Sequence, residues 1–241
     1  MRKENVNSLL NHAKTDLDKI ESEYNNALKN KNIPDSLKID IKNFLENLRS
    51  VLDYLAHDIY EQKVHPVRIA NGDPPIQKIY FPYGKTSNNF NFRLGTCFPN
   101  LSNIDNDLFL LIEGIQPFKA GDSWLLDFCN VTNEKKHNSL TPQERSETQT
   151  MTASVGGTSV TMPINNPNFS IHQGSNCKVT LGGVPVRFTN QEIKPLGPGL
   201  QRTITTWVSF KFSNTNINVL PFLKKVYSSI NSFSNQVYNY L

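Results

Sequence analysis

The stretch Arg49-Ser-Val-Leu-Asp-Tyr-Leu-Ala-His57 lies in the middle of the strongest helical pattern in the chain. From about residue 35 to residue 62, apolar side chains recur every three or four positions, at Leu37, Ile41, Phe44, Leu48, Leu52, Leu55 and Ile59. This period places them on one face of an α-helix. Arg49, Asp53 and His57 are four residues apart and therefore form one strip beside that face. We expect the strip to face a neighbouring helix or a cleft.

A second long helix is predicted immediately before this one. Its apolar positions are separated by alternating steps of four and three, at Val6, Leu10, Ala13, Leu17, Ile20, Tyr24 and Ala27. The residues around Pro34 interrupt the pattern, and Pro34 itself suits the first turn of the following helix. Two long helices with a short connection predict an antiparallel helical hairpin.

Residues 64–100 change in character because proline punctuates them, at Pro66, Pro74, Pro75, Pro82 and Pro99. Proline disfavours helix interiors and favours extended chain. We therefore expect a long ordered crossover here, with a short strand at residues 79–81. Phe90 and Phe92 are expected to hold the crossover against the helices, and the alternative is a lid over a site.

Two more helices are predicted before the character of the chain changes again. One runs from about residue 102 to Ile115, and Pro117 stops it. The other begins at Trp124 behind a Gly-Asp-Ser cap and ends near Asn138.

After Pro142 the apolar period changes to two, which is typical of strands. Gly156-Gly157 and Gly182-Gly183 each separate two alternating runs and predict tight hairpin turns. Helical spacing returns from Val219 to the C-terminus. The sequence therefore predicts an α+β fold. An antiparallel bundle of about five helices occupies residues 1–142, five or six antiparallel strands are inserted at residues 143–213, and a C-terminal helix in residues 214–241 returns to the bundle.

Composition limits the classes of protein that fit. The chain has 241 residues, 37% apolar residues and a formal net charge of +4. This mild charge, without a run of Lys or Arg longer than two, permits nucleic-acid binding without requiring it. The cysteines, Cys97, Cys129 and Cys177, are widely spaced and predict buried reduced thiols. No signal peptide or membrane-spanning run is recognisable, so we expect a cytoplasmic protein with no membrane association.

The strip on the second helix offers the clearest chemistry. Asp53 lies within reach of both Arg49 and His57, and a carboxylate beside an imidazole fixes the tautomer of the ring. Such a histidine can act as a general acid or base, and the arginine can stabilise a phosphorane during metal-independent RNA cleavage. The alternative is a structural ion pair with a satisfied histidine at a helix–helix seam.

A second polar cluster, Asn133-Glu-Lys-Lys-His137, ends the helix that begins at Trp124. If the two helices are adjacent, His57 and His137 meet beside Arg49, with Asp53 and Asn133 orienting the rings. The two lysines already suit a helix C-terminus, and a terminal histidine is often only a cap. No His-x-x-x-His pair, phosphate-binding glycine loop or Gly-x-Ser-x-Gly motif occurs, so neither a metal nor a cofactor is expected.

An ordered set of short motifs resembles a group of uncharacterised bacterial proteins. The group has an Arg-Ser-x-Leu-Asp helix, a Gln-Pro-aromatic stop and an Asn-x-x-Lys-His helix end, which correspond here to residues 49–53, 116–118 and 133–137. More distantly, the helical core resembles HEPN domains. Those are small helical bundles, usually dimeric, and many are RNases of toxin–antitoxin and antiphage systems. Their usual motif places four to six residues between Arg and His, whereas seven separate Arg49 from His57.

The resemblance implies a homodimeric, metal-independent endoribonuclease that acts on RNA. Arg49, Asp53, His57, Asn133 and His137 are the candidate catalytic residues. The competing hypothesis is a non-catalytic interaction or oligomerisation protein whose β region binds a cognate protein partner.

Overall fold

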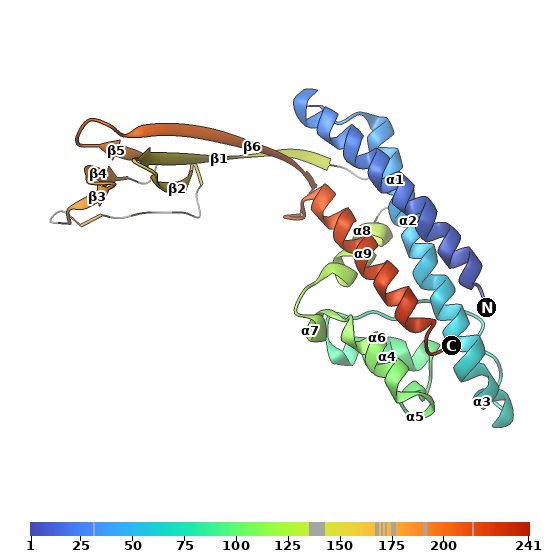
Figure 1. Ribbon diagram of the computed structural model, residues 1–241. Coiled ribbons are helices and arrows are strands. Elements are labelled where there is room, and N and C mark those ends of the chain that lie inside the picture. Colours follow the sequence, from blue (N-terminus) through green and yellow to red (C-terminus); the bar gives the residue numbers. More distant parts are fainter. Residues whose placement is uncertain are drawn as a thin grey trace. The chain divides into compact units, whose positions relative to one another are not determined.

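The computed structural model describes residues 1–30, 32–134, 143–166, 169, 171, 173–174, 177–189, 192–213 and 215–241. They form two compact units. The helical unit comprises Met1–Gln143 and Phe212–Leu241, and the β unit comprises Glu144–Lys211. The predicted α+β class, with antiparallel strands and a closing C-terminal helix, is confirmed (Figure 1).

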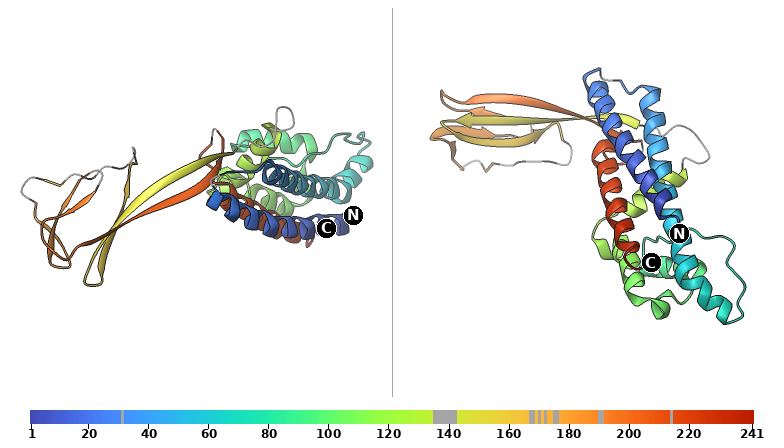
Figure 2. Two further views of the ribbon diagram at one scale, coloured as in Figure 1. Left: turned by 90° about the horizontal axis from the view of Figure 1, so that it is seen from above. Right: turned by 45° about the vertical axis from the view of Figure 1, so that its right-hand side comes forward.

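The predicted helical hairpin is present as α1 (Lys3–Asn30) and α2 (Asp35–Ile59), which lie side by side (Figures 1 and 2). Every apolar position predicted for the facing stripes of these helices is buried. Full burial of one large aliphatic side chain contributes about 1.5–3 kcal/mol. The paired stripes therefore stabilise the hairpin and hold the strip at Arg49 in a fixed orientation.

The second helix does not end near residue 62 as predicted. It continues through a π-helical turn, η1 (Tyr60–Val64), into α3 (His65–Ala70). Pro66 lies in the first turn of α3. Because α2, η1 and α3 are continuous, the missing N–H of Pro66 interrupts the backbone hydrogen bonds of the helix. Just before it, the His65 N–H donates to the Tyr60 carbonyl five residues back, as in a π turn.

Residues 71–86 contain no strand, so the short strand predicted at residues 79–81 is wrong. The crossover prediction also missed α4 (Ser87–Cys97). The prolines of the segment all lie outside this helix, and Thr86 caps it by accepting the Asn89 N–H. Phe90 is buried as expected, whereas Phe92 is 77% exposed.

The helix predicted near residues 102–115 is two helices, α5 (Leu101–Ile104) and α6 (Asn106–Gly114). Asp105 separates them, because its backbone is extended and its carboxylate accepts the Leu108 N–H as the cap of α6. Pro117 does not only stop a helix but begins α7 (Pro117–Ala120). The bundle therefore has more and shorter helices than the five expected.

The next helix, α8 (Trp124–Glu134), begins where predicted, and its predicted end at Asn138 lies outside the described residues. The closing helix, α9 (Val219–Val237), lies beside α1 and α2 (Figure 2). Both chain ends are bound to α2 at one point. The carboxylate of Asp58 is fully buried and accepts hydrogen bonds from the backbone and guanidinium of Arg2 and from the Tyr238 hydroxyl.

The β unit is built from two three-stranded sheets of order β2-β1-β6 and β3-β4-β5. The strands are β1 (Gln143–Val155), β2 (Thr158–Ile164), β3 (Val179–Leu181), β4 (Val184–Phe188), β5 (Ile193–Pro195) and β6 (Gln201–Phe212). Both predicted Gly-Gly turns are present, and all four glycines have positive φ, as a tight hairpin turn of this kind requires. A small apolar core stabilises the unit, formed by Met151, Ala153, Met162, Ile164, Leu181, Val186 and Ile193.

Candidate functional site

Arg49 forms the ion pair that the sequence predicts with Asp53. The distance between Arg49 Nε and Asp53 Oδ2 is 3.5 Å, and the Arg49 side chain is 12% exposed. The other carboxylate oxygen of Asp53 accepts the Phe81 N–H at 3.3 Å. Among the described residues no hydrogen bond joins Asp53 to His57. Of the two predicted contacts of Asp53, the one with Arg49 is therefore present and the one with His57 is not.

The guanidinium of Arg49 also contacts α8. Its Nη1 donates to the Sγ of Cys129 at 2.9 Å. Cys129 is fully buried, and this burial raises the pKa of its thiol to about 12. The thiol is therefore neutral at physiological pH and serves as a weak acceptor for the arginine. The Arg49 guanidinium therefore lies between this thiol and the carboxylate of Asp53.

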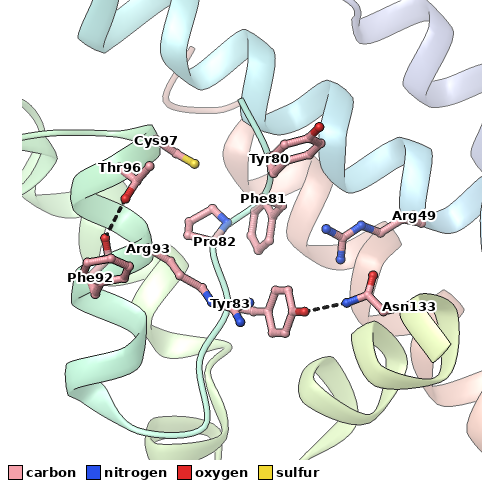
Figure 3. A pocket seen from close by; sticks show the side chains of 10 residues that line it. All are labelled: Arg49, Tyr80, Phe81, Pro82, Tyr83, Phe92, Arg93, Thr96, Cys97 and Asn133. Carbon is pink, nitrogen blue, oxygen red and sulfur yellow. Dashed lines mark hydrogen bonds between the residues drawn. The ribbon is translucent and has the colours of Figure 1, made fainter. Parts of the chain in front are cut away.

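Tyr83 lies between two arginines (Figure 3). The guanidinium carbon of Arg93, from α4, is 4.3 Å from the centre of the Tyr83 ring, and that of Arg49 is 5.6 Å from it. The face of an aromatic ring carries partial negative charge and attracts such cations. The Tyr83 hydroxyl accepts a hydrogen bond of 2.7 Å from the Asn133 amide. Four elements of the helical unit thus meet at this phenol.

These residues line a cavity of about 440 Å³, which we call the Arg–Tyr cavity. Its walls are Arg49, Tyr80, Phe81, Pro82, Tyr83, Phe92, Arg93, Thr96, Cys97 and Asn133 (Figure 3). Tyr80 and Phe92 are 56% and 77% exposed. Arg93 is exposed and has no carboxylate partner among the described residues. The cavity therefore combines an arginine that has no carboxylate partner in the described part of the chain with exposed aromatic side chains.

The segment that carries Tyr83 is held in place by Gln116, which is fully buried. Its side-chain oxygen accepts the Gly84 N–H at 3.1 Å, and its amide donates to the carbonyls of Ile112 and Pro82 at 3.1 and 3.4 Å. All the polar atoms of this buried amide group are therefore used. Gln116 positions the tyrosine without lining the cavity itself.

Only some of the predicted site residues line the Arg–Tyr cavity. Arg49 and Asn133 line the Arg–Tyr cavity, and Asp53 holds Arg49 behind it. His57 is on α2 but is not among the described residues that line the cavity. His137 lies outside the described residues, so the predicted meeting of His57 with His137 stays a prediction.

The sequence does not predict a role for Tyr83 or Arg93, and it marks Gln116 only as part of a helix stop. Phe81 belongs to the strand predicted at residues 79–81 and Pro82 to the prolines of the crossover, and neither pattern assigns a role to Tyr83. An aromatic residue between proline and glycine in an ordered loop is nevertheless a reasonable wall for a site. No sequence pattern marks Arg93, because the helix that presents it is not predicted.

The three cysteines are free thiols, as predicted. Cys97 and Cys129 are buried, whereas Cys177 is exposed, contrary to the prediction of buried thiols.

No group of His, Cys, Asp or Glu among the described residues is arranged to hold a metal ion. None of the described helices is long and apolar enough to cross a membrane. Comparisons with protein-family models, curated proteins and solved structures found no match for the chain. The resemblance to HEPN domains therefore stays a prediction.

Proposed function

We propose that this protein binds single-stranded RNA at the Arg–Tyr cavity. The supporting observation is the placement of Arg49 and Arg93 over the ring of Tyr83, in a cavity whose other walls include the exposed rings of Tyr80 and Phe92. Proteins bind single strands through positive charge along the backbone and aromatic side chains under the bases.

The two kinds of side chain have separate tasks. Arg93, which lacks a carboxylate partner among the described residues, is available for a phosphate. Arg49 is held by Asp53 and Cys129 and keeps a fixed direction into the cavity. Phe92 and Tyr80 offer stacking surfaces, and one stacked base contributes about 1–3 kcal/mol. The cavity volume of about 440 Å³ suits one nucleotide rather than a duplex.

Metal-independent cleavage of the bound RNA is the catalytic form of this proposal. It assigns phosphate stabilisation to Arg49, acid–base chemistry to His57 and His137, and their orientation to Asp53 and Asn133. The geometry favours binding over cleavage, because the Asn133 amide is engaged by Tyr83 and none of the described residues lining the cavity is a histidine. A non-catalytic binding protein is the competing form.

Fluorescence anisotropy with a short labelled oligouridylate tests the binding. We expect Arg93→Gln to weaken the affinity about tenfold and Phe92→Ala to weaken it by a similar factor, since each removes one contact. Lys29→Gln is the matched control, because Lys29 is an exposed cation that does not line the cavity. Equal affinities for wild type, Arg93→Gln and Phe92→Ala would refute the proposal.

The same oligonucleotide reports on cleavage when the products are separated on a gel. Cleavage by the wild type that is lost in His57→Ala and in His137→Ala supports the catalytic form. Binding without cleavage, or cleavage that both variants retain, removes these histidines from the mechanism.

A further inference from the structure

The β unit carries most of the net charge of the chain. Residues 144–211 contain six Lys and Arg residues and three Asp and Glu residues, a formal charge of +3 out of the +4 of the whole protein. One of those carboxylates, Glu192, lies near two cations, at 3.1 Å from Lys194 and 3.9 Å from Arg202. Glu147 pairs with Arg145, so among the described residues Lys178, Arg187 and Lys211 are the cations of the unit without a carboxylate partner.

Strand register gathers three of these cations into a row. Arg187 of β4 lies directly opposite Lys194 of β5. On the other side, β4 pairs with β3 so that Val186 is opposite Val179, and one step further along this register places Lys178 opposite Arg187. We call Lys178, Arg187 and Lys194 the cation row. Adjacent strands lie about 4.8 Å apart, so the row crosses the sheet in close steps.

All three residues of the row are exposed, and the strands that carry or adjoin them, β3, β4 and β5, are labelled in Figure 1. Along β4 the buried residue Val186 alternates with the exposed residues Pro185 and Arg187. Directly opposed like charges on adjacent strands destabilise a sheet. Lys194 is paired with Glu192, but among the described residues neither Lys178 nor Arg187 has a carboxylate partner. The arrangement is therefore unfavourable for folding alone and favourable for an anionic ligand.

Two members of the row, Lys178 and Arg187, line a cavity that Lys194 does not line. This cavity of about 520 Å³ is lined by Gln173, Gly174, Cys177, Lys178, Val179, Thr180, Pro185, Val186, Arg187 and Leu196. Thr180 and the two cations supply donors for phosphate oxygens, while Pro185 and Leu196 supply a small apolar surface. The large aliphatic residue exposed beside the cavity is Leu196, whose side chain is 64% exposed. One such side chain offers too little apolar surface for insertion into a membrane.

The geometry points to a second binding site, in which the cation row binds the sugar–phosphate backbone of a single-stranded nucleic acid without reading its sequence. A linear array of cations beside the Thr180 hydroxyl matches the repeating charge of such a backbone. This inference does not depend on the Arg–Tyr cavity, because all of its residues belong to the β unit.

The test compares two double variants of the full-length protein that remove the same charge. Lys178→Gln with Arg187→Gln removes two members of the row, and Arg202→Gln with Lys211→Gln removes two other cations of the β unit. Binding of labelled oligouridylate is measured by anisotropy between about 50 and 200 mM salt. We expect the first pair to reduce affinity about tenfold and to make the slope of log K against log salt shallower by about 1.4, since each phosphate contact contributes about 0.7. The second pair is expected to retain the wild-type slope.

Arg187→Lys, which keeps the charge, is expected to bind like the wild type and shows that the charge carries the effect. An unchanged circular-dichroism spectrum of the first double variant checks that its loss of binding is not due to misfolding. Equal losses in both double variants would assign the effect to overall charge and overturn the inference. The inference would also be overturned if Lys178→Gln with Arg187→Gln bound oligouridylate like the wild type but lost binding to phosphatidylserine vesicles. That result would indicate a membrane ligand. Arg93→Gln in the same assay separates the two proposals: if it binds normally while the first pair does not, the cation row stands and the Arg–Tyr cavity proposal falls.

Discussion

Tyr83 shows how one residue can acquire a chemical environment from distant parts of the chain. Arg49 reaches its ring from α2, Arg93 from α4, and Asn133 reaches its hydroxyl from α8. Cation–aromatic contacts are worth about 0.5–1 kcal/mol when exposed and more when desolvated. The ring therefore orients two guanidinium groups that face the same cavity (Figure 3). Its own position depends on the hydrogen bonds of Gln116.

Gln116→Leu tests that dependence. The change keeps a similar volume but leaves the Gly84 N–H without its acceptor, and an unsatisfied buried group costs about 1–3 kcal/mol. We expect the free energy of unfolding, measured in urea, to fall by this amount, and oligouridylate affinity to fall with it as Tyr83 shifts. Gln236→Leu is the control, because Gln236 is exposed on α9 and its loss is expected to change stability by less than about 0.5 kcal/mol. Wild-type stability in Gln116→Leu would contradict this role for the glutamine.

At the scale of elements, the site depends on the docking of α4 against the Tyr83 segment. A Cβ added to Gly84 would lie 2.4 Å from the backbone nitrogen of Phe90. This close approach brings the first turn of α4 next to the loop and places Arg93 over Tyr83. Phe90 completes the contact by packing near the rings of Phe109 and Phe118. The φ angle of Gly84 is not in the left-handed region. A glycine is therefore required because the Phe90 backbone leaves no room for a Cβ, and not because of the conformation of Gly84 itself.

Gly84→Ala and Gly95→Ala make a matched pair, because one glycine precedes α4 and the other lies within it. Overpacking at Gly84 is expected to lower the free energy of unfolding by about 1–3 kcal/mol. Gly95 sits in a helix with open space where an alanine methyl group would lie, so Gly95→Ala is expected to raise stability by about 0.5–1 kcal/mol. Thermal and urea unfolding followed by circular dichroism measures both. Wild-type stability in Gly84→Ala would show that the contact with Phe90 is not limiting.

At the scale of the whole molecule, the chain contains two units with separate cores. The helical unit is stabilised by the buried faces of α1, α2 and α9, and by the Asp58 cluster that joins both chain ends to α2. The β unit has its own small core around Met151 and Ile193. Between the β strands, Gln149 donates a hydrogen bond to Thr206, so these positions on β1 and β6 are neighbours.

Excision of the β unit tests its independence from the helical unit. Replacing residues 150–205 with an Asn-Gly turn links Gln149 to Thr206 through a two-residue hairpin connection. We expect the shortened protein to keep its helical circular-dichroism spectrum and a Tm within about 4 °C of the helical transition of the full chain, a change of about 1 kcal/mol. The full-length protein measured in parallel is the reference. Loss of the helical signal would show that the helical core needs the inserted residues.

The sequence by itself determined the features that depend on local periodicity. The buried faces of α1 and α2, the closing helix α9 and both Gly-Gly hairpins follow from neighbours a few residues apart, and all of these are confirmed. The Arg49–Asp53 pair belongs to this group because its members are four residues apart on one helix. The predictions of a homodimer, a cytoplasmic location and RNA cleavage stay predictions.

Only the tertiary structure decided which side chains meet. Arg49 finds Cys129 at a separation of 80 residues, and Asn133 finds Tyr83 at a separation of 50. Such contacts depend on how helices pack and not on any local spacing. The cation row likewise depends on strand register, because a shift of one residue would turn Arg187 toward the core. The strip at Arg49–His57 was therefore a reliable marker of the helix, while its chemistry was set by the loop and helices that packed against it.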